Sequence, residues 1–209
     1  MMIKRICSGL PIITLALFLF ACASTQLVTE WNDKKYQGEQ FARIMVIGAI
    51  DNALYRRAYE DAIVEKFIAN GLNAIASYTL ISNLKDYDDE DKLKQAVATT
   101  SADAVLVAKL IEYNESEKYI PPSYDIDPYI GAGGSYYNSY HSAIFVSYRP
   151  GYTKKITTIR IGSELFAADS EQMVWAAETK SFNPGSYQNV VDKLAEITLM
   201  SLKTNGFVK

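Results

Sequence analysis

A continuous apolar run at residues 42–50, ARIMVIGAI, constrains the fold of this chain more than any other feature. A strand with one solvated face alternates apolar and polar residues, whereas a strand buried on both faces is apolar throughout. A second run of this kind, ADAVLVAKLIEY, covers residues 102–113 and predicts a central strand. The two runs therefore predict strands in the interior of a sheet.

Helical patterns separate these strands. Residues 53–69 carry apolar side chains at helical spacing, and Asn70 and Gly71 supply a C-terminal stop. Residues 72–80 predict a further strand, and the acidic segment 85–91, KDYDDED, is typical of a helix N-terminus. The resulting order β-α-β-α-β favours parallel pairing through crossover connections.

The C-terminal part predicts a β-hairpin and a closing helix. Strands are expected over 154–169 and 172–182, with a turn at Asp169 and the residue after it. Ser186 caps a last amphipathic helix that Asn205 and the following glycine end. We therefore predict an α/β fold with a mixed sheet in two or three layers. Its order is β-α-β-α-β, a Tyr/Gly-rich excursion, a β-hairpin and a C-terminal helix.

The N-terminus has the three parts of a secretory signal peptide. Lys4 and Arg5 precede an apolar core, and a small residue, Ala21, ends it. The uninterrupted apolar piece at 15–23 is too short for a transmembrane helix, which needs about 20 apolar residues. We predict that residues 1–21 are a signal peptide.

The sequence Leu-Phe-Ala-Cys at 19–22 resembles the lipobox of bacterial lipoprotein precursors. The resemblance implies that Cys22 is acylated and becomes the new N-terminus, because its thiolate is the nucleophile that accepts the lipid. No Asp follows Cys22, which resembles the outer-membrane default of lipoprotein sorting. We expect residues 22–40 to be a lipidated tether that becomes ordered near Trp31, a packing residue. Residues 41–209 are expected to form a single periplasmic domain.

Composition excludes several chemistries. Cleavage leaves 188 residues (209 minus 21) and takes the formal charge from −3 to −5, because Lys4 and Arg5 are lost, so we expect no nucleic-acid partner. With Cys22 acylated, the domain has no free thiol and no disulfide. His141 is the only histidine. An EF-hand loop begun at Asp86 fails because Asp91 stands where glycine is needed. We expect no metal site and no cofactor.

The segment 114–152 differs in composition from the rest of the chain. It holds most of the 15 tyrosines, set among Gly, Ser, Pro and Asn. This composition resembles that of recognition loops, in which Tyr supplies contact area at a low entropy cost. A mobile or self-packed loop without a partner is an equally weighted alternative. The candidate partner-binding residues are Tyr124, Tyr129, Tyr136, Tyr137, Tyr140, Tyr148 and Tyr152.

The phrases RIMVIGAI, ADAVLVAKL and SELFAADSEQMVWAAET, with the order of elements, resemble the anticodon-binding-like domain of bacterial envelope proteins. Examples are curli-secretion-channel lipoproteins, lipoprotein activators of penicillin-binding proteins, and the N-terminal domain of the Tol-system propeller protein. The resemblance covers about residues 40–207. It implies a binding or assembly module, although fold alone does not transfer an activity.

Three functions follow as hypotheses. The leading one is a non-catalytic outer-membrane lipoprotein that binds an envelope protein or peptidoglycan. The second is a self-assembling secretion-channel or ring subunit. The third is a cell-wall hydrolase centred on His141, beside Asp125 or Asp127. No GxSxG elbow frames any serine near His141, so we expect no enzyme.

Overall fold

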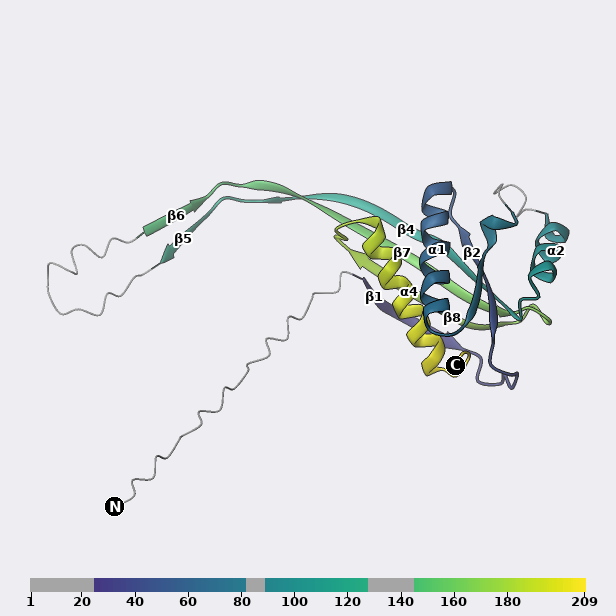
Figure 1. The fold of residues 1–209 in the computed structure, drawn as a ribbon. Coiled ribbons are helices and arrows are strands. Elements are labelled where there is room, and N and C mark those ends of the chain that lie inside the picture. Colours follow the sequence, from purple (N-terminus) through teal and green to yellow (C-terminus); the bar gives the residue numbers. More distant parts are fainter. Residues whose placement is uncertain (1–24, 82–88, 128–144) are drawn as a thin grey trace, which may run out of the picture.

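The structure is a computed structural model of the chain, and it describes residues 25–81, 89–127 and 145–209 (Figure 1). The elements in chain order are β1 (Thr25–Asn32), β2 (Arg43–Ala49), α1 (Ala53–Ala69), β3 (Asn73–Ala76), the 3-10 turn η1 (Ser77–Thr79), α2 (Glu90–Thr100), β4 (Ala104–Ile120), β5 (Ser123–Asp127), β6 (Phe145–Arg149), β7 (Tyr152–Ala167), β8 (Met173–Phe182) and α4 (Tyr187–Thr204).

Six strands form one mixed sheet in the order β1-β8-β7-β4-β2-β3. The strands β3, β2 and β4 are parallel, whereas β4-β7, β7-β8 and β8-β1 are antiparallel pairs. This confirms the predicted fold class, including the parallel unit, the C-terminal hairpin and the closing helix. Among the described strands, β5 and β6 pair only with each other.

The position of strand β2, with both of its faces covered, explains why its sequence is apolar throughout. Ile44 and Val46 point to the face that α1 and α4 cover, and they belong to the main core with residues such as Leu106 and Trp175. Met45 and Ile47 point to the opposite face, where α2 packs. The fold therefore has three layers over β2 and β4. It has two layers over β7, β8 and β1, because no helix of the described residues covers their second face.

The acidic segment before α2 acts as a helix start, as predicted. Asp89 is the N-cap, and its carboxylate accepts a hydrogen bond from the backbone N–H of Lys92. Glu90 and Asp91 lie in the first turn, where their negative charges interact favourably with the positive end of the helix dipole.

The segment expected to be a tether contains a strand. Strand β1 begins at Thr25 and pairs with the C-terminal half of the hairpin, with Thr25 opposite Ser181. The two hydroxyls are 2.8 Å apart and both residues are buried. The expectation that order begins near Trp31 is therefore wrong, as is the packing role given to Trp31. Its side chain is 48% exposed, because β1 is an edge strand and no element of the described residues covers its outer face.

Candidate interaction surface

A two-stranded arm projects from the sheet (Figure 1). Of the tyrosines that the sequence singled out, it carries Tyr124, Tyr148 and Tyr152. β4 and β7 remain paired as far as Ile120 opposite Tyr152, but their neighbours stop earlier. β2 last pairs with β4 at Lys109, and β8 ends at Phe182, opposite Thr158. Beyond that point the ribbon has no third strand among the described residues. We call residues 115–127 and 145–157 the arm.

The structure of the arm differs from the expectation for the segment 114–152, whose composition predicts a loop-like excursion. Most of its described residues are in β structure instead. β-branched residues such as Ile156 and Thr157 favour the extended ribbon. An ion pair between Lys155 Nζ and Glu115 Oε2, 2.9 Å apart, joins its strands diagonally. Hydrogen bonds from Lys155 and Tyr113 lower the pKa of the Glu115 carboxyl.

Proline interrupts the ladder on both strands at the same place. Pro121 and Pro122 separate β4 from β5, and Pro150 with Gly151 separates β6 from β7. Proline has no N–H to give to a ladder, so the pairing stops there and resumes on the other side. Gly151 suits a close approach of the two strands, because a Cβ there would lie 2.9 Å from Pro122 Cδ and 3.1 Å from the backbone oxygen of Ile120. The arm therefore consists of two ribbon segments joined at one break.

The described tyrosines of the arm are exposed. Tyr124 and Tyr148 are cross-strand partners with ring centroids 5.1 Å apart, and they are 67% and 55% exposed. Tyr119 and Tyr152 flank the proline break and are 64% and 58% exposed. The structure thus brings Tyr124, Tyr148 and Tyr152 onto one arm with Tyr119. The remaining predicted residues, Cys22, Tyr129, Tyr136, Tyr137, Tyr140 and His141, lie outside the described residues.

An open pocket of about 910 Å³ lies at the opposite end of the sheet, beside α2. Its apolar floor comes from three strands and from the inner face of α2: Ile47, Val105, Val107, Phe166, Leu93 and Val97. Its rim is acidic, with one cation among five carboxylates: Glu39, Glu90, Asp103, Asp169, Glu171 and Lys94. Sequence reasoning missed this pocket, because four separate segments form it.

The negative charge of the rim affects the pKa of Tyr36, which also lines the pocket. Burial, together with the negative charges of Asp169 and Asp103, raises the pKa of the Tyr36 hydroxyl. Lys94 is held between two of the carboxylates, 2.7 Å from Glu90 and 2.9 Å from Glu171. The pocket therefore combines an apolar floor with a rim of net negative charge.

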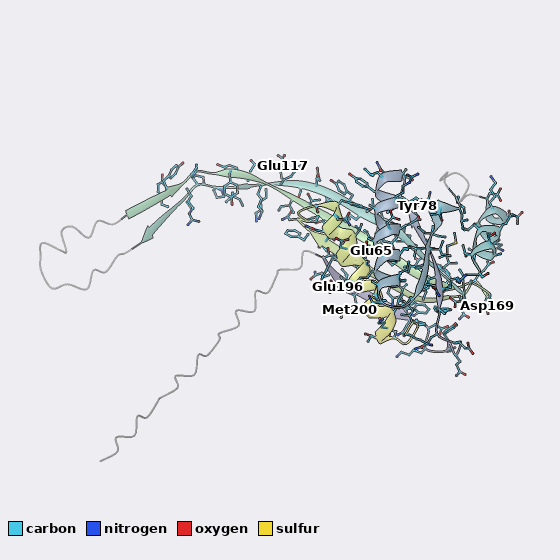
Figure 2. The ribbon with its side chains drawn as sticks, in the orientation of Figure 1. Glu65, Tyr78, Glu117, Asp169, Glu196 and Met200 are labelled. Atoms are coloured by element: carbon cyan, nitrogen blue, oxygen red, sulfur yellow. The ribbon has the colours of Figure 1, made fainter. Side chains whose placement is uncertain are left out.

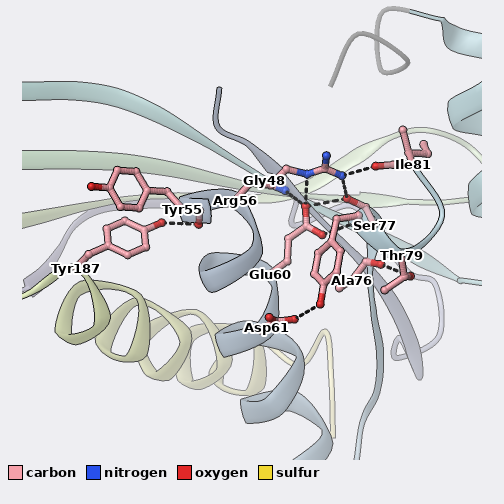
Figure 3. Close-up of polar contacts among 11 residues, drawn as sticks. Gly48, Tyr55, Arg56, Glu60, Asp61, Ala76, Ser77, Thr79, Ile81 and Tyr187 are labelled. Carbon is pink, nitrogen blue, oxygen red and sulfur yellow. Dashed lines mark hydrogen bonds and ion pairs between the residues drawn. The ribbon is translucent and has the colours of Figure 1, made fainter. Parts of the chain in front are cut away.

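A buried ion pair lies under the end of β2, and it is also absent from the sequence predictions (Figure 3). Arg56 Nε donates to Glu60 Oε1 at 2.9 Å, and the two side chains are 2% and 0% exposed. The same oxygen of Glu60 accepts from Gly48 N and from the Ser77 hydroxyl, and Tyr78 N donates to Oε2. Because these partners belong to the protein backbone and core, the pair fixes α1 against β2 and η1 and has no open side for a substrate.

None of the helices in residues 25–81, 89–127 and 145–209 is long and apolar enough to cross a membrane. In the same residues, no group of three or more His, Cys, Asp or Glu side chains could hold a metal ion.

Comparison with known proteins gave solved structures only. No protein-family model matches the chain, and no curated protein matches it. Among the solved structures similar to it is the PelC dodecamer from Paraburkholderia phytofirmans, with 10% identity and a TM-score of 0.43, covering 88% of this chain and 99% of that chain. Another is the lipoprotein GNA1162 from Neisseria meningitidis, with 11% identity and a TM-score of 0.43, covering 78% of this chain and 99% of that chain. At these scores the similarities carry no argument about function, which must come from the residues of the chain itself.

Proposed function

We propose that this protein is a lipid-anchored, non-catalytic binding or assembly module of the bacterial cell envelope, and that the arm is its contact element. Cys22 carries the lipid, and the domain faces the periplasm from the outer membrane. The partner is another envelope protein or a peptidoglycan strand.

The arm is the observation that carries this proposal. An isolated two-stranded ribbon is only marginally stable in water, and the edges of such a ribbon offer unpaired N–H and C=O groups to another chain. Four tyrosines that are 55–67% exposed add apolar area to these edges. Covering them would bury about 500 Å², if each ring has about 200 Å² to bury. That is more than half of the ~800 Å² that each partner contributes to a standard interface.

The position of β1 supports a location of the arm near the membrane, given an acylated Cys22. Only Ala23 and Ser24 separate Cys22 from Thr25. Three extended residues reach about 11 Å at most. Thr25 lies opposite Ser181, which also pairs with Ile159 at the base of the arm. The arm therefore starts close to the anchor, and a partner located at the membrane is within its reach.

Arm truncation tests the proposal. We would replace residues 119–153 with Asn-Gly, which joins the cross-strand partners Lys118 and Lys154 by a two-residue hairpin turn. We expect an unchanged urea midpoint, because the core lies elsewhere, and loss of the partner that the full-length lipoprotein crosslinks in the envelope. Capture of the same partner by the truncated protein would refute the role of the arm.

A matched pair of variants separates the aromatic rings from the ribbon. Changing Tyr119, Tyr124, Tyr148 and Tyr152 together to Phe keeps the rings, and changing them to Ser removes them. We expect the Phe variant to retain most of the capture and the Ser variant to lose it. Equal capture by both would assign recognition to the ribbon edges.

The proposal includes no reaction, because His141 is the only histidine and no serine near it lies in a GxSxG elbow. The rival is a cell-wall hydrolase centred on His141. A change in measured cell-wall turnover on His141→Ala, with lipoprotein abundance unchanged, would favour that rival. Self-assembly into a ring or channel is the second alternative, and the opposite charges of the pocket rim and of the arm favour contact between copies.

A further inference from the structure

We propose that the acidic pocket beside α2 binds the arm of a second copy of this protein. The segment that binds is the part of the arm around the proline break, residues 118–124 and 148–155, which we call the arm middle. The arm middle includes the tyrosines of the envelope contact proposed above. The pocket is a separate surface, and the contact between the two copies requires neither the envelope partner nor the lipid.

The arm middle is positively charged. It contains Lys118, Arg149, Lys154 and Lys155, and neither of its two stretches contains a carboxylate. Carboxylates occur only beside it, at Glu117 on the body side and in β5 toward the tip. The two ribbon segments therefore carry their cations together at the break.

Two of these cations oppose each other. Lys118 and Lys154 are direct cross-strand partners. Like charges in this position destabilise a ribbon. No carboxylate in the part of the chain that the structure describes forms an ion pair with either of them, whereas Lys155 is paired with Glu115. An anionic partner seated over Lys118 and Lys154 would remove this repulsion.

The pocket supplies the opposite charge. Lys94 is already bracketed by Glu90 and Glu171, and both carboxylate oxygens of Asp103 accept backbone N–H groups. Within the described residues, Glu39 and Asp169 form no ion pair. They are therefore the rim carboxylates that can meet Lys118 and Lys154 of another copy.

The apolar parts of the two surfaces also match. Tyr119 and Tyr152 lie beside the paired lysines and are more than half exposed. The pocket floor presents valine, leucine and phenylalanine side chains from β4, α2 and β7. An apolar pocket with a few charged groups at its rim is the usual form of a binding site. Tyrosine rings flanked by cations have the chemistry that fits it.

The geometry requires two molecules. β4 begins beside the pocket, where Val105 lines its floor, and runs 17 residues to Ile120 in the arm. At about 3.3 Å per residue this strand is roughly 55 Å long. Figure 2 shows Asp169 at one end of the body and Glu117 on the arm beyond the other end. The pocket and the arm middle therefore cannot meet within one chain, and the contact between two copies is head-to-tail. Repeated contacts of this kind form a closed ring if the rotation between neighbouring copies closes, and a filament if it does not.

Charge reversal on each side tests the contact. The arm variant is Lys118→Glu with Lys154→Glu, and the pocket variant is Glu39→Lys with Asp169→Lys. All four side chains lie at the surface, so each variant should fold with an unchanged urea midpoint. We would measure self-association of the full-length lipoprotein in detergent by sedimentation velocity and native mass spectrometry, at low salt and at ~0.15 M salt.

We expect the wild type to self-associate, and each variant alone to associate about tenfold or more weakly, as for the loss of close charge pairs across an interface. An equimolar mixture of the two variants should recover association, because the reversed charges are again complementary. A wild type that remains monomeric at all concentrations tested would overturn the proposal, as would variants that associate like the wild type or a mixture that does not recover.

Other occupants give distinct results. If the arm variant instead loses binding to anionic vesicles while self-association is unchanged, the arm middle binds lipid and the proposal fails. If a monomeric wild type still crosslinks an envelope partner through its tyrosines, the inference about the pocket fails and the proposed function stands. If the protein self-associates through the pocket but the arm truncation leaves partner capture unchanged, the proposed function fails and this inference stands.

Discussion

Replacing Arg56 with Met should destabilise the domain strongly, because Glu60 would remain buried without a counter-charge. Glu60 is fully buried and Arg56 is 2% exposed. Removing one partner of a buried ion pair costs about 3–5 kcal/mol, a large part of the ~5–15 kcal/mol that stabilises a typical domain. For a domain of this size that corresponds to a decrease of about 6–20 °C in the melting temperature.

Urea unfolding of the protein without its signal peptide would measure this effect. The fluorescence of Trp175, whose side chain is 1% exposed, reports the loss of the core. Lys155→Met is the matched control, because Lys155 and Glu115 are also 2.9 Å apart but 62% and 37% exposed. An exposed pair contributes less than about 1 kcal/mol. If Arg56→Met costs no more than Lys155→Met, the reasoning from burial is wrong.

Two double variants separate the charge of Glu60 from its hydrogen bonds. Arg56→Met with Glu60→Leu removes both charges but leaves the N–H groups of Gly48 and Tyr78 without acceptors, at about 1–3 kcal/mol each. Arg56→Met with Glu60→Gln keeps one acceptor oxygen and no charge. We therefore expect the Gln double variant to be more stable than Arg56→Met alone and the Leu double variant to recover little. Full recovery by the Leu variant would show that the hydrogen bonds contribute nothing.

The remaining predictions concern the anchor, the core and the arm. Cys22→Ser should abolish labelling by radioactive palmitate and release the protein from the membrane fraction, and retained labelling would place the lipid elsewhere. Burial raises the pKa of Tyr59, so the folded state keeps a proton that the unfolded chain loses near pH 10, and stability falls as pH rises above ~10. Tyr59→Phe should reduce this alkaline loss in urea titrations between about pH 9 and 11. At pH 7 it should change the free energy of unfolding little, because Tyr59 Oη makes no hydrogen bond of ordinary geometry in the described part of the chain and has only the Ser163 hydroxyl nearby. Gly151→Ala should increase chymotrypsin cleavage in the arm, since its Cβ would lie 2.9 Å from Pro122 Cδ, while the free energy of unfolding measured in urea changes by less than about 0.5 kcal/mol.

The sequence predicted the elements whose periodicity reflects burial. The run at 42–50 is apolar on both sides because α1 and α4 bury Ile44 and Val46 while α2 buries Met45 and Ile47. Helix α1 was predicted with its observed ends, since Asn52 caps it and Gly71 adopts a positive φ just after it. Local sequence signals suffice for such elements, because the apolar pattern that predicts an element and the capping residues that end it lie in the same short segment.

Elements that depend on a distant partner were not predictable in this way. β1 has the sequence TQLVTEWN, which contains no continuous apolar run and becomes a strand only because β8 offers an edge. Pro121, Pro122, Pro150 and Gly151 indicate a loop when read singly, yet they lie opposite each other and interrupt a ribbon. Similarly, the i,i+4 spacing of Arg56 and Glu60 is typical of an ion pair on a helix surface. The pair is buried because Gly48 and Ser77, from other segments, contact Glu60.

The early start of β1 changes what a lipid on Cys22 would do to the domain. A flexible tether of 18 residues, from Ala23 to Gln40, would let the domain sample distances of about 20–25 Å from the membrane and rotate freely. With β1 paired from Thr25, the reach is about 11 Å, and the anchored end is the end from which the arm leaves. The pocket lies at the other end of the same sheet, away from the end at which the chain would be anchored (Figure 1). A short anchor on Cys22 would therefore orient the domain as well as retain it: it would bring the base of the arm close to membrane components and leave the acidic pocket facing away from the anchor.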